Sequence, residues 1–325
     1  MKLLKSLVYC SLICTTVFLS SAHAFEGPLQ TRNQFPLFMH VDAPHLESAS
    51  TENSFSASLS HSSVYMTKQS RQWIVNLDLE ITELDLRYKK DIPGLFEVGV
   101  DVPIVRLTAG FMDGFLSEYH SFFNFPDYGR SERPRNAFLY EVRKDGALVI
   151  QGKDDKTAFG DVRLSLKKKL IQGDPVVNVS VLANVELPTG DAPTGYGSGD
   201  VDCGAAILAD TNFNEWLRMY SNIGGVFPGR FAGKEKTFSL RPYYYGGVGL
   251  EAAAWRSMSL LGQVFVQSSP FPTMGIGPVD DTAVLLVLGG RYSTGRHNVE
   301  LSLTEDPNTT GAPDFTLNLT YKLKM

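Results

Sequence analysis

The chain has 325 residues, and its 30 lysines and arginines against 35 aspartates and glutamates give a formal net charge of −5. This acidic balance argues against a nucleic-acid partner, because phosphate binding needs an excess of basic residues. Only three cysteines are present, and two of them lie near the start of the chain, which excludes a disulfide framework.

Residues 1–24 have the pattern of a secretory signal sequence. Two lysines precede an apolar stretch, and Ala22-His23-Ala24 follows as a small-residue cleavage site. We expect cleavage after Ala24, which leaves Cys203 as a small packed residue without a catalytic role. The rest of the chain has no apolar run of the about 18 residues that a membrane helix needs. A place in a membrane would therefore require a closed β-barrel.

Residues 25–53 precede the first predicted strand and contain three prolines and an apolar patch at 35–41. We expect this segment to start in the periplasm and either to fold into the lumen of a barrel as a plug or to bind a periplasmic partner. It also holds four possible metal ligands whose spacing is not typical of a specific site, so that we expect no metal: His40, Asp42, His45 and Glu47.

The first strands alternate with a period of two residues. Residues 54–65 place apolar and aromatic side chains on one face and serines on the other. Residues 73–88 also alternate, but their apolar positions change parity in the middle, which predicts a β-bulge near Thr82 and Glu83. A tight Ile-Pro-Gly turn then leads into a strand at 96–102.

Residues 105–158 break this rhythm, since they are rich in aromatic and charged residues, and they predict local helix or hairpin structure in a long loop. The alternation then resumes. The further strands are expected at 160–170, 176–188, 200–210, 216–227, 238–252, 257–268, 282–293, 298–305 and 314–325.

The count of strands is twelve, and the connections alternate between short turns and longer loops. This pattern is typical of bacterial outer-membrane barrels and favours an all-β, closed antiparallel transmembrane β-barrel over 54–325, with both termini on the periplasmic side. A water-soluble β-sandwich also alternates, but it would carry more charge on its outer face. The turns are expected at 89–94, 171–175, 211–215, 253–256 and 294–297, and the extracellular loops at 66–71, 105–158, 188–199, 228–236, 269–281 and 306–313.

Two stretches carry a resemblance to known families. "ELPTGDAPTGYGSGDVD" (186–202) resembles the Pro-Thr-Gly-Asp hairpin of bacterial outer-membrane transporter barrels, and "GPLQTRNQFPLF" (27–38) resembles the bacterial domain-of-unknown-function 3187 family. The resemblance implies an outer-membrane barrel without catalytic or cofactor-binding residues. The chain departs from the usual barrel pattern at its last residue, which is Met325 where phenylalanine or tryptophan is usual.

Charged side chains at the strand positions expected to face the lumen are the candidate functional residues of a channel or transporter for small solutes. Basic residues collect near the predicted periplasmic ends of the strands, and acidic residues lie higher. Two interpretations stay open, a cationic exit that favours anions and opposite charges that pair and fill the barrel. The candidates are Asp78, Glu80, Arg87, Lys89, Asp101, Arg163, Lys167, Lys169, Glu186, Arg218, Arg291, Lys322 and Lys324.

Two other functions were weighed. His61 and Ser63 lie two residues apart on one strand, as in outer-membrane lipid hydrolases, but a working site needs an acid or amide beside the imidazole. The alternation of the neighbouring strand predicts that apolar residues such as Trp73 and Leu79 face outward beside this pair. Because none of them is an acid or amide, we expect no enzyme. An adhesion barrel acting through residues 105–159 is the other alternative. The expected partners are membrane lipid and lipopolysaccharide, the outer-membrane insertion machinery and a small solute, with no cofactor.

Overall fold

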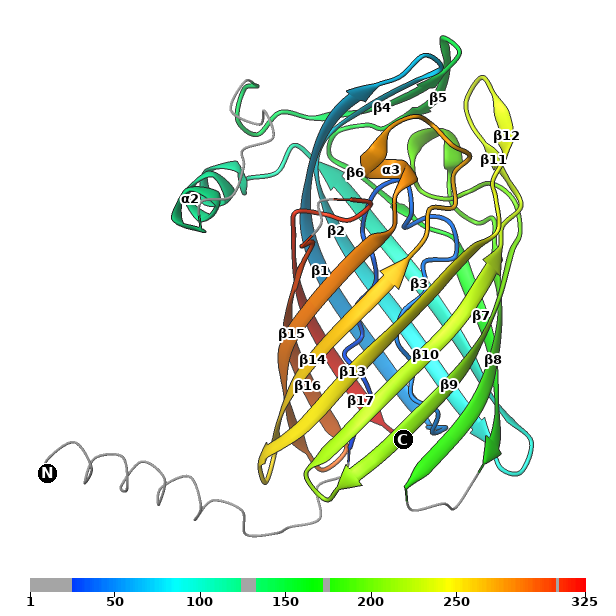
Figure 1. Ribbon diagram of the computed structural model, residues 1–325, viewed down its shortest axis with the longest axis vertical. Coiled ribbons are helices and arrows are strands. Elements are labelled where there is room, and N and C mark those ends of the chain that lie inside the picture. Colours follow the sequence, from blue (N-terminus) through cyan, green and yellow to red (C-terminus); the bar gives the residue numbers. More distant parts are fainter. Residues whose placement is uncertain (1–24, 124–132, 172–175, 308–309) are drawn as a thin grey trace, which may run out of the picture.

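The computed structural model describes residues 25–123, 133–171, 176–307 and 310–325 (Figure 1). The predicted signal sequence, residues 1–24, lies outside the described residues, as does most of the predicted turn at 171–175. The wall is a closed antiparallel barrel of twelve strands, as predicted. These strands are β1 (Ser54–Gln69), β2 (Trp73–Ile92), β3 (Phe96–Thr108), β7 (Val162–Ile171), β8 (Val177–Leu187), β9 (Asp202–Asn214), β10 (Leu217–Phe227), β13 (Tyr243–Trp255), β14 (Met258–Gln267), β15 (Ala283–Thr294), β16 (His297–Glu305) and β17 (Phe315–Lys324).

The last strand closes the barrel on the first. β17 pairs with β1 from Lys324 opposite Ser54 to Phe315 opposite Ser63, and β2 pairs with β3 on the other side of β1. The Met325 N–H also donates a hydrogen bond to the Asn53 carbonyl. Because every wall strand has two neighbours, the barrel has no free edge.

The two ends of the barrel differ. Short connections join β2 to β3, β9 to β10, β13 to β14 and β15 to β16 at what we call the short-turn end. Nearly all longer connections lie at the opposite, long-loop end (Figure 1). They contain α2 (Asp113–Phe123), β4 (Leu139–Lys144), β5 (Ala147–Gln151), β6 (Lys156–Phe159), the short 3-10 helix η2 (Ala192–Thr194), β11 (Arg230–Ala232), β12 (Thr237–Ser239) and α3 (Gly277–Asp280). No helix in the described ranges is both long and apolar enough to cross a bilayer.

Three predicted boundaries at the long-loop end were wrong. The loop expected from 105 starts later, because β3 runs to Thr108. The loop expected at 66–71 is a short turn at 70–72, because β1 and β2 continue as a paired ribbon beyond the neighbouring strands. The strand expected at 238–252 begins at Tyr243, since Thr237–Ser239 pairs with β11 in a separate small hairpin. The helix and hairpin expected within 105–158 are α2 and the β4–β5 pair.

The outer face of the barrel wall is apolar over most of its height. Leu260, Leu288, Leu301 and Leu319 are each about half exposed, on four different strands. Inward positions carry buried polar groups instead, as in the hydrogen bond of 2.8 Å between the hydroxyls of Ser58 and Thr320. Apolar outward and polar inward residues in alternation are the pattern of a transmembrane barrel.

The upper half of β2 reverses this pattern. The pairing of β2 with β1 and with β3 runs without a register shift through Thr82 and Glu83, so the predicted β-bulge is wrong. Odd-numbered residues of β2 therefore face the lumen along the whole strand. At the long-loop end the buried inward residues are apolar, and at the short-turn end they are charged. The apolar ones are Trp73, Val75, Leu77, Leu79 and Ile81. The alternation of the sequence predicted that these five residues face lipid, and this was wrong.

Candidate functional site

Residues 25–53, called the N-terminal segment below, lie inside the barrel, where Figure 1 draws them in dark blue. The segment starts at the short-turn end, where Glu26 pairs with Lys324 of β17. It rises to the long-loop end, where the Asn33 side chain donates a hydrogen bond of 2.6 Å to the Gly311 carbonyl. It then returns to the short-turn end, where Glu52 lies 2.6 Å from Lys322.

The turn of the segment near the long-loop end is packed in apolar side chains. Phe35 and Phe38 meet edge to face with ring centres 5.3 Å apart, and Phe38 stacks on Phe271 at 6.4 Å. The same cluster contains the inward apolar residues of β2, such as Leu77. Tyr140 belongs to the same cluster and donates a hydrogen bond of 3.0 Å to the Pro36 carbonyl. The reversed pattern of β2 therefore has a cause, because these residues form a core with the segment rather than a surface for lipid.

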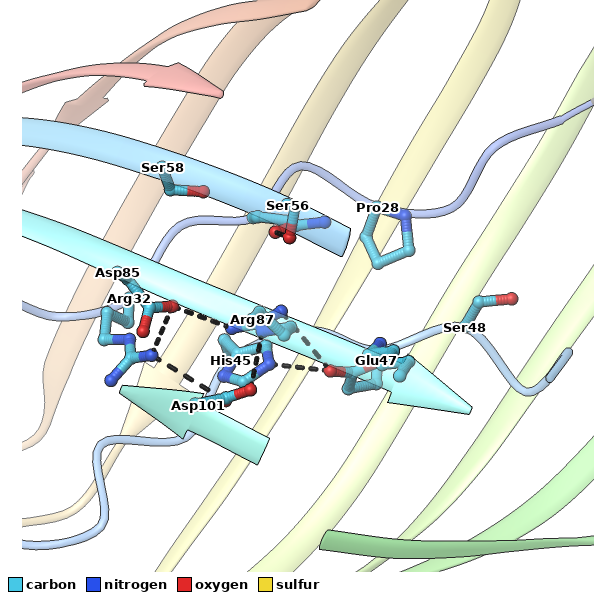
Figure 2. A network of polar contacts seen from close by, with 12 residues as sticks. Pro28, Arg32, His45, Glu47, Ser48, Ser56, Ser58, Asp85, Arg87 and Asp101 are labelled. Atoms are coloured by element: carbon cyan, nitrogen blue, oxygen red, sulfur yellow. Dashed lines mark hydrogen bonds and ion pairs between the residues drawn. The ribbon is translucent and has the colours of Figure 1, made fainter. Parts of the chain in front are cut away.

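The lower half of the lumen is filled by ion pairs between segment and wall. Figure 2 shows Arg32 of the segment reaching Asp85 of β2, with a shortest N–O distance of 2.7 Å, and Asp101 of β3 at 3.8 Å. Arg87 of β2 bridges Asp101 at 3.0 Å and Glu47 of the returning arm at 3.5 Å. Each guanidinium therefore contacts carboxylates of two elements, which fixes the segment against the wall.

Further ion pairs and hydrogen bonds between the segment and the wall follow around the lumen. Asp42 lies 2.8 Å from Arg163 of β7, and its backbone N–H donates a hydrogen bond of 2.6 Å to Glu186 of β8. Glu47 also contacts Lys89 of β2. Lys167 of β7 pairs with Glu97 at 3.0 Å and donates to the carbonyls of residues 48 and 50 of the segment.

On the opposite wall Arg291 of β15 is fully buried. It lies 2.7 Å from Glu251 and 2.8 Å from Glu300, and it donates a hydrogen bond of 2.6 Å to the Gly27 carbonyl. Arg218 of β10 pairs with Asp210 at 3.2 Å, and the Asp210 carboxylate accepts the Ala49 N–H at 2.9 Å. A cavity of about 130 Å³ remains at the short-turn end, between the two arms of the segment.

The basic candidates named from the sequence thus lie in the lumen, and most of them are paired. Asp101 and Glu186 also face it, whereas Lys169 is half-buried at the end of β7. The sequence did not identify the partners contributed by the N-terminal segment. Alternation in the sequence indicates which residues of a strand face inward. The N-terminal segment is irregular and has no alternation, so its inward contacts could not be predicted in this way. The missed residues are Glu26, Arg32, Asp42, Glu47 and Glu52.

Asp78 and Glu80 were predicted to face the lumen, and this was wrong. They alternate with the lumen-facing residues of β2 and so lie on the outer side of the wall, where Asp78 pairs with Arg133 at 2.6 Å. The earlier reason for excluding an enzyme also fails, because Glu80 is an acid 2.9 Å from His61 Nε2. The other ring nitrogen of His61 is bonded to the Thr82 hydroxyl at 2.8 Å. Both ring nitrogens of His61 are thus bonded to side chains of β2.

The histidines of the segment are buried and kept neutral. Burial lowers the pKa of His40 to about 3. Burial and the positive charge of Arg87 lower the pKa of His45 to about 3, although Glu47, 2.7 Å away, opposes the shift. In the described part of the chain, no group of three or more histidine, cysteine or carboxylate side chains is arranged to hold a metal ion.

Comparisons with known proteins bear on the fold. The sequence model of the family described as "Protein of unknown function (DUF3187)" matches residues 6–325. No curated protein matches the chain. Among solved structures, the COG4313 outer membrane channel from Pseudomonas putida F1 is similar at 11% identity and a TM-score of 0.57, over 88% of this chain and 100% of that one. The NanC porin is similar at 7% identity and a TM-score of 0.47, over 83% of this chain and 100% of that one.

Proposed function

This chain belongs to the DUF3187 family, and we propose that it is an outer-membrane channel for small solutes whose lumen is closed by its own N-terminal segment. The apolar outer face of the wall supports a place in a membrane. The fold shared with the COG4313 outer membrane channel supports the outer membrane in particular. Insertion there would use the machinery that reads a terminal strand, here β17, and would bring the wall into contact with lipid and lipopolysaccharide.

The proposal rests on one observation, that the N-terminal segment fills the lumen of the barrel. A barrel of about eight strands can be filled by the side chains of its own wall, and a twelve-stranded one leaves more room. Here that room is taken by a separate stretch of chain, residues 25–53, which enters and leaves at the same end. Because the segment is not part of the wall, it can leave without breaking a strand pairing. Its departure would open a path whose half near the short-turn end is lined by charged side chains.

The charges indicate which solutes such a path would favour. The segment supplies Glu26, Asp42, Glu47 and Glu52, each paired with a basic residue of the wall. When these acids leave, the basic residues near the short-turn end lose part of their compensation. We therefore expect an opened channel to favour anions, as rings of basic residues do in other pores.

The test is the conductance of single channels in planar bilayers, for the intact barrel and for a variant that lacks residues 25–47. The variant should show larger and longer open steps than the intact protein, and a salt gradient should give a reversal potential that favours anions. Equal conductance of the two proteins would overturn closure by the segment. A cation preference would overturn the proposed selectivity but leave the channel itself intact.

A matched control separates loss of the segment from general weakening. Arg106→Ala removes an exposed ion pair with Asp155, on an outer part of the long-loop end. This variant should conduct like the intact protein, because the pair does not contact the N-terminal segment.

A further inference from the structure

The outer face of the barrel has a polar region on β1 and β2 beside the apolar residues of β17. His61 and Ser63 of β1 face outward opposite Leu317 and Phe315 of β17. The next strand adds the outward acid Glu80, bonded to His61. An uncovered carboxylate at this height would meet the edge of the bilayer, where burial without partners is costly.

The chain after β3 covers this region. The N–H groups of Phe111 and Met112 donate hydrogen bonds of 2.8 Å and 2.5 Å to the Glu80 carboxylate. Phe111 also stacks on the His61 ring, with centres 5.2 Å apart. Gly110 makes the approach possible, since its φ of +76° suits glycine and a Cβ there would overlap the Glu80 carboxylate. Glu80 is consequently only 2% exposed.

Helix α2 follows directly and lies with one face on the wall. Met112 and Leu116 are buried against Phe315, and the Phe115 ring meets Phe315 edge to face at 5.7 Å. Phe315 is the uppermost residue of the outward row of β17 that continues with Leu317. The helix therefore sits at the upper edge of the apolar band of the barrel, beside the wall and not above the lumen (Figure 1).

Three aromatic side chains of this region touch the wall only in part or lie away from it, and they are unusually exposed. The exposed fractions of Phe111, Phe115 and Phe122 are 74%, 50% and 82%. Phe115 and Phe122 lie seven residues apart, which places them on the same side of the helix. Exposed phenylalanines beside an apolar barrel wall are typical of the apolar face of a segment that lies in a membrane interface.

We propose that α2 and the turn before it lie in the membrane interface and insert Phe111, Phe115 and Phe122 into the lipid of the outer leaflet. They cover the polar region of β1 and β2 and continue the apolar band over it. The occupant is lipid rather than a protein, because the exposed face is continuous with the lipid-facing row of β17. The proposal rests on the membrane location that the proposed function includes, and it adds a surface that the channel itself does not require.

The test measures the depth of a nitroxide spin label at position 122. The label is attached to Phe122→Cys in a Cys203→Ser background, in the full barrel reconstituted into phospholipid vesicles. Collision of the label with oxygen, which prefers lipid, is compared with collision with a water-soluble nickel chelate. References are Leu319→Cys on the lipid-facing wall and Lys153→Cys in an exposed loop.

The label at 122 should collide with the nickel chelate about ten-fold less than the label at 153, and its depth should lie between the two references. Accessibility equal to that at 153 would overturn the proposal. Protection from both reagents would also overturn it, since a protein partner or a second copy would then cover the helix. If the label at 319 is itself open to water, the membrane location fails, which is a failure of the proposed function and is recognisable as such.

Discussion

At the scale of single residues, ion pairs with the barrel wall hold the N-terminal segment in the lumen. Arg32 illustrates the consequence, because it is nearly buried and faces three carboxylates, of which Asp85 is nearest at 2.7 Å. A buried ion pair adds little to stability compared with apolar packing, but removing one partner leaves the other charge uncompensated. Such contacts are specific when made and costly when half broken, which suits the release of the segment that we propose.

Arg32→Ala should therefore loosen the N-terminal segment. Loss of one member of a buried pair costs about 3–5 kcal/mol, and this cost falls on the docked state only. We expect a marked increase in open time in single-channel recordings, with the open conductance of the deletion variant. Arg106→Ala serves again as the control, and an open time for Arg32→Ala no longer than that of this control would contradict the role given to Arg32.

The two histidines of the segment predict a response to acid. In the docked state the pKa of His40 and of His45 is lowered to about 3, while in a released segment it should return to about 6.5. The released state thus binds protons more readily, so the contribution of these two rings to the stability of the docked state is complete above pH 6.5 and is lost as the pH falls below it. At pH 5 the loss is about 2 kcal/mol for each ring.

Open probability should accordingly rise as the pH is lowered from 7.5 to 5 in planar bilayers. Replacing both histidines with glutamine removes the titrating groups and should flatten this part of the profile. A profile unchanged by the double replacement would show that carboxylates such as Glu47, and not the histidines, set the response.

At the scale of elements, β2 explains both the success and the failure of sequence reasoning. Alternation located the strand and its partners, because a period of two residues depends only on backbone geometry. It did not tell which face is inside. The lipid and the packed segment are both apolar surroundings, so an apolar row such as Trp73 to Ile81 fits either side. The shift of the apolar positions by one residue had predicted a bulge. The strand is in fact unbroken, and its inward residues change from apolar in one half to charged in the other.

This assignment predicts a difference between two leucines. Leu77 is fully buried against the N-terminal segment, while Leu319 is half exposed on the outer face of the wall. Leu77→Ala leaves a cavity in a packed core and should cost about 2–5 kcal/mol in the free energy of unfolding. Leu319→Ala should cost less, since lipid chains can fill the space. Urea titrations of the barrel in vesicles measure both, and a larger cost for Leu319→Ala would contradict the orientation of β2.

At the scale of the whole molecule, the sequence was sufficient for the architecture. The number of strands, the alternation of turns and loops, and the closing partnership of β17 with β1 follow from repeated local patterns. The site was only half predictable. Basic wall residues such as Lys322 were identified from strand parity, but some of their acidic partners come from a segment without periodicity. Only the folded chain brings Glu52 to Lys322.

Closure of the lumen by the N-terminal segment is tested most directly by tethering it. Gln30 of the segment and Ser56 of β1 are in hydrogen-bond contact at 2.8 Å and carry no charge. Cysteines at both positions, in a Cys203→Ser background, can be joined by a short crosslinker that a reductant cleaves. Single-channel conductance of this protein should be absent while the crosslink is intact and should appear after reduction. Equal conductance before and after cleavage would contradict closure by the segment.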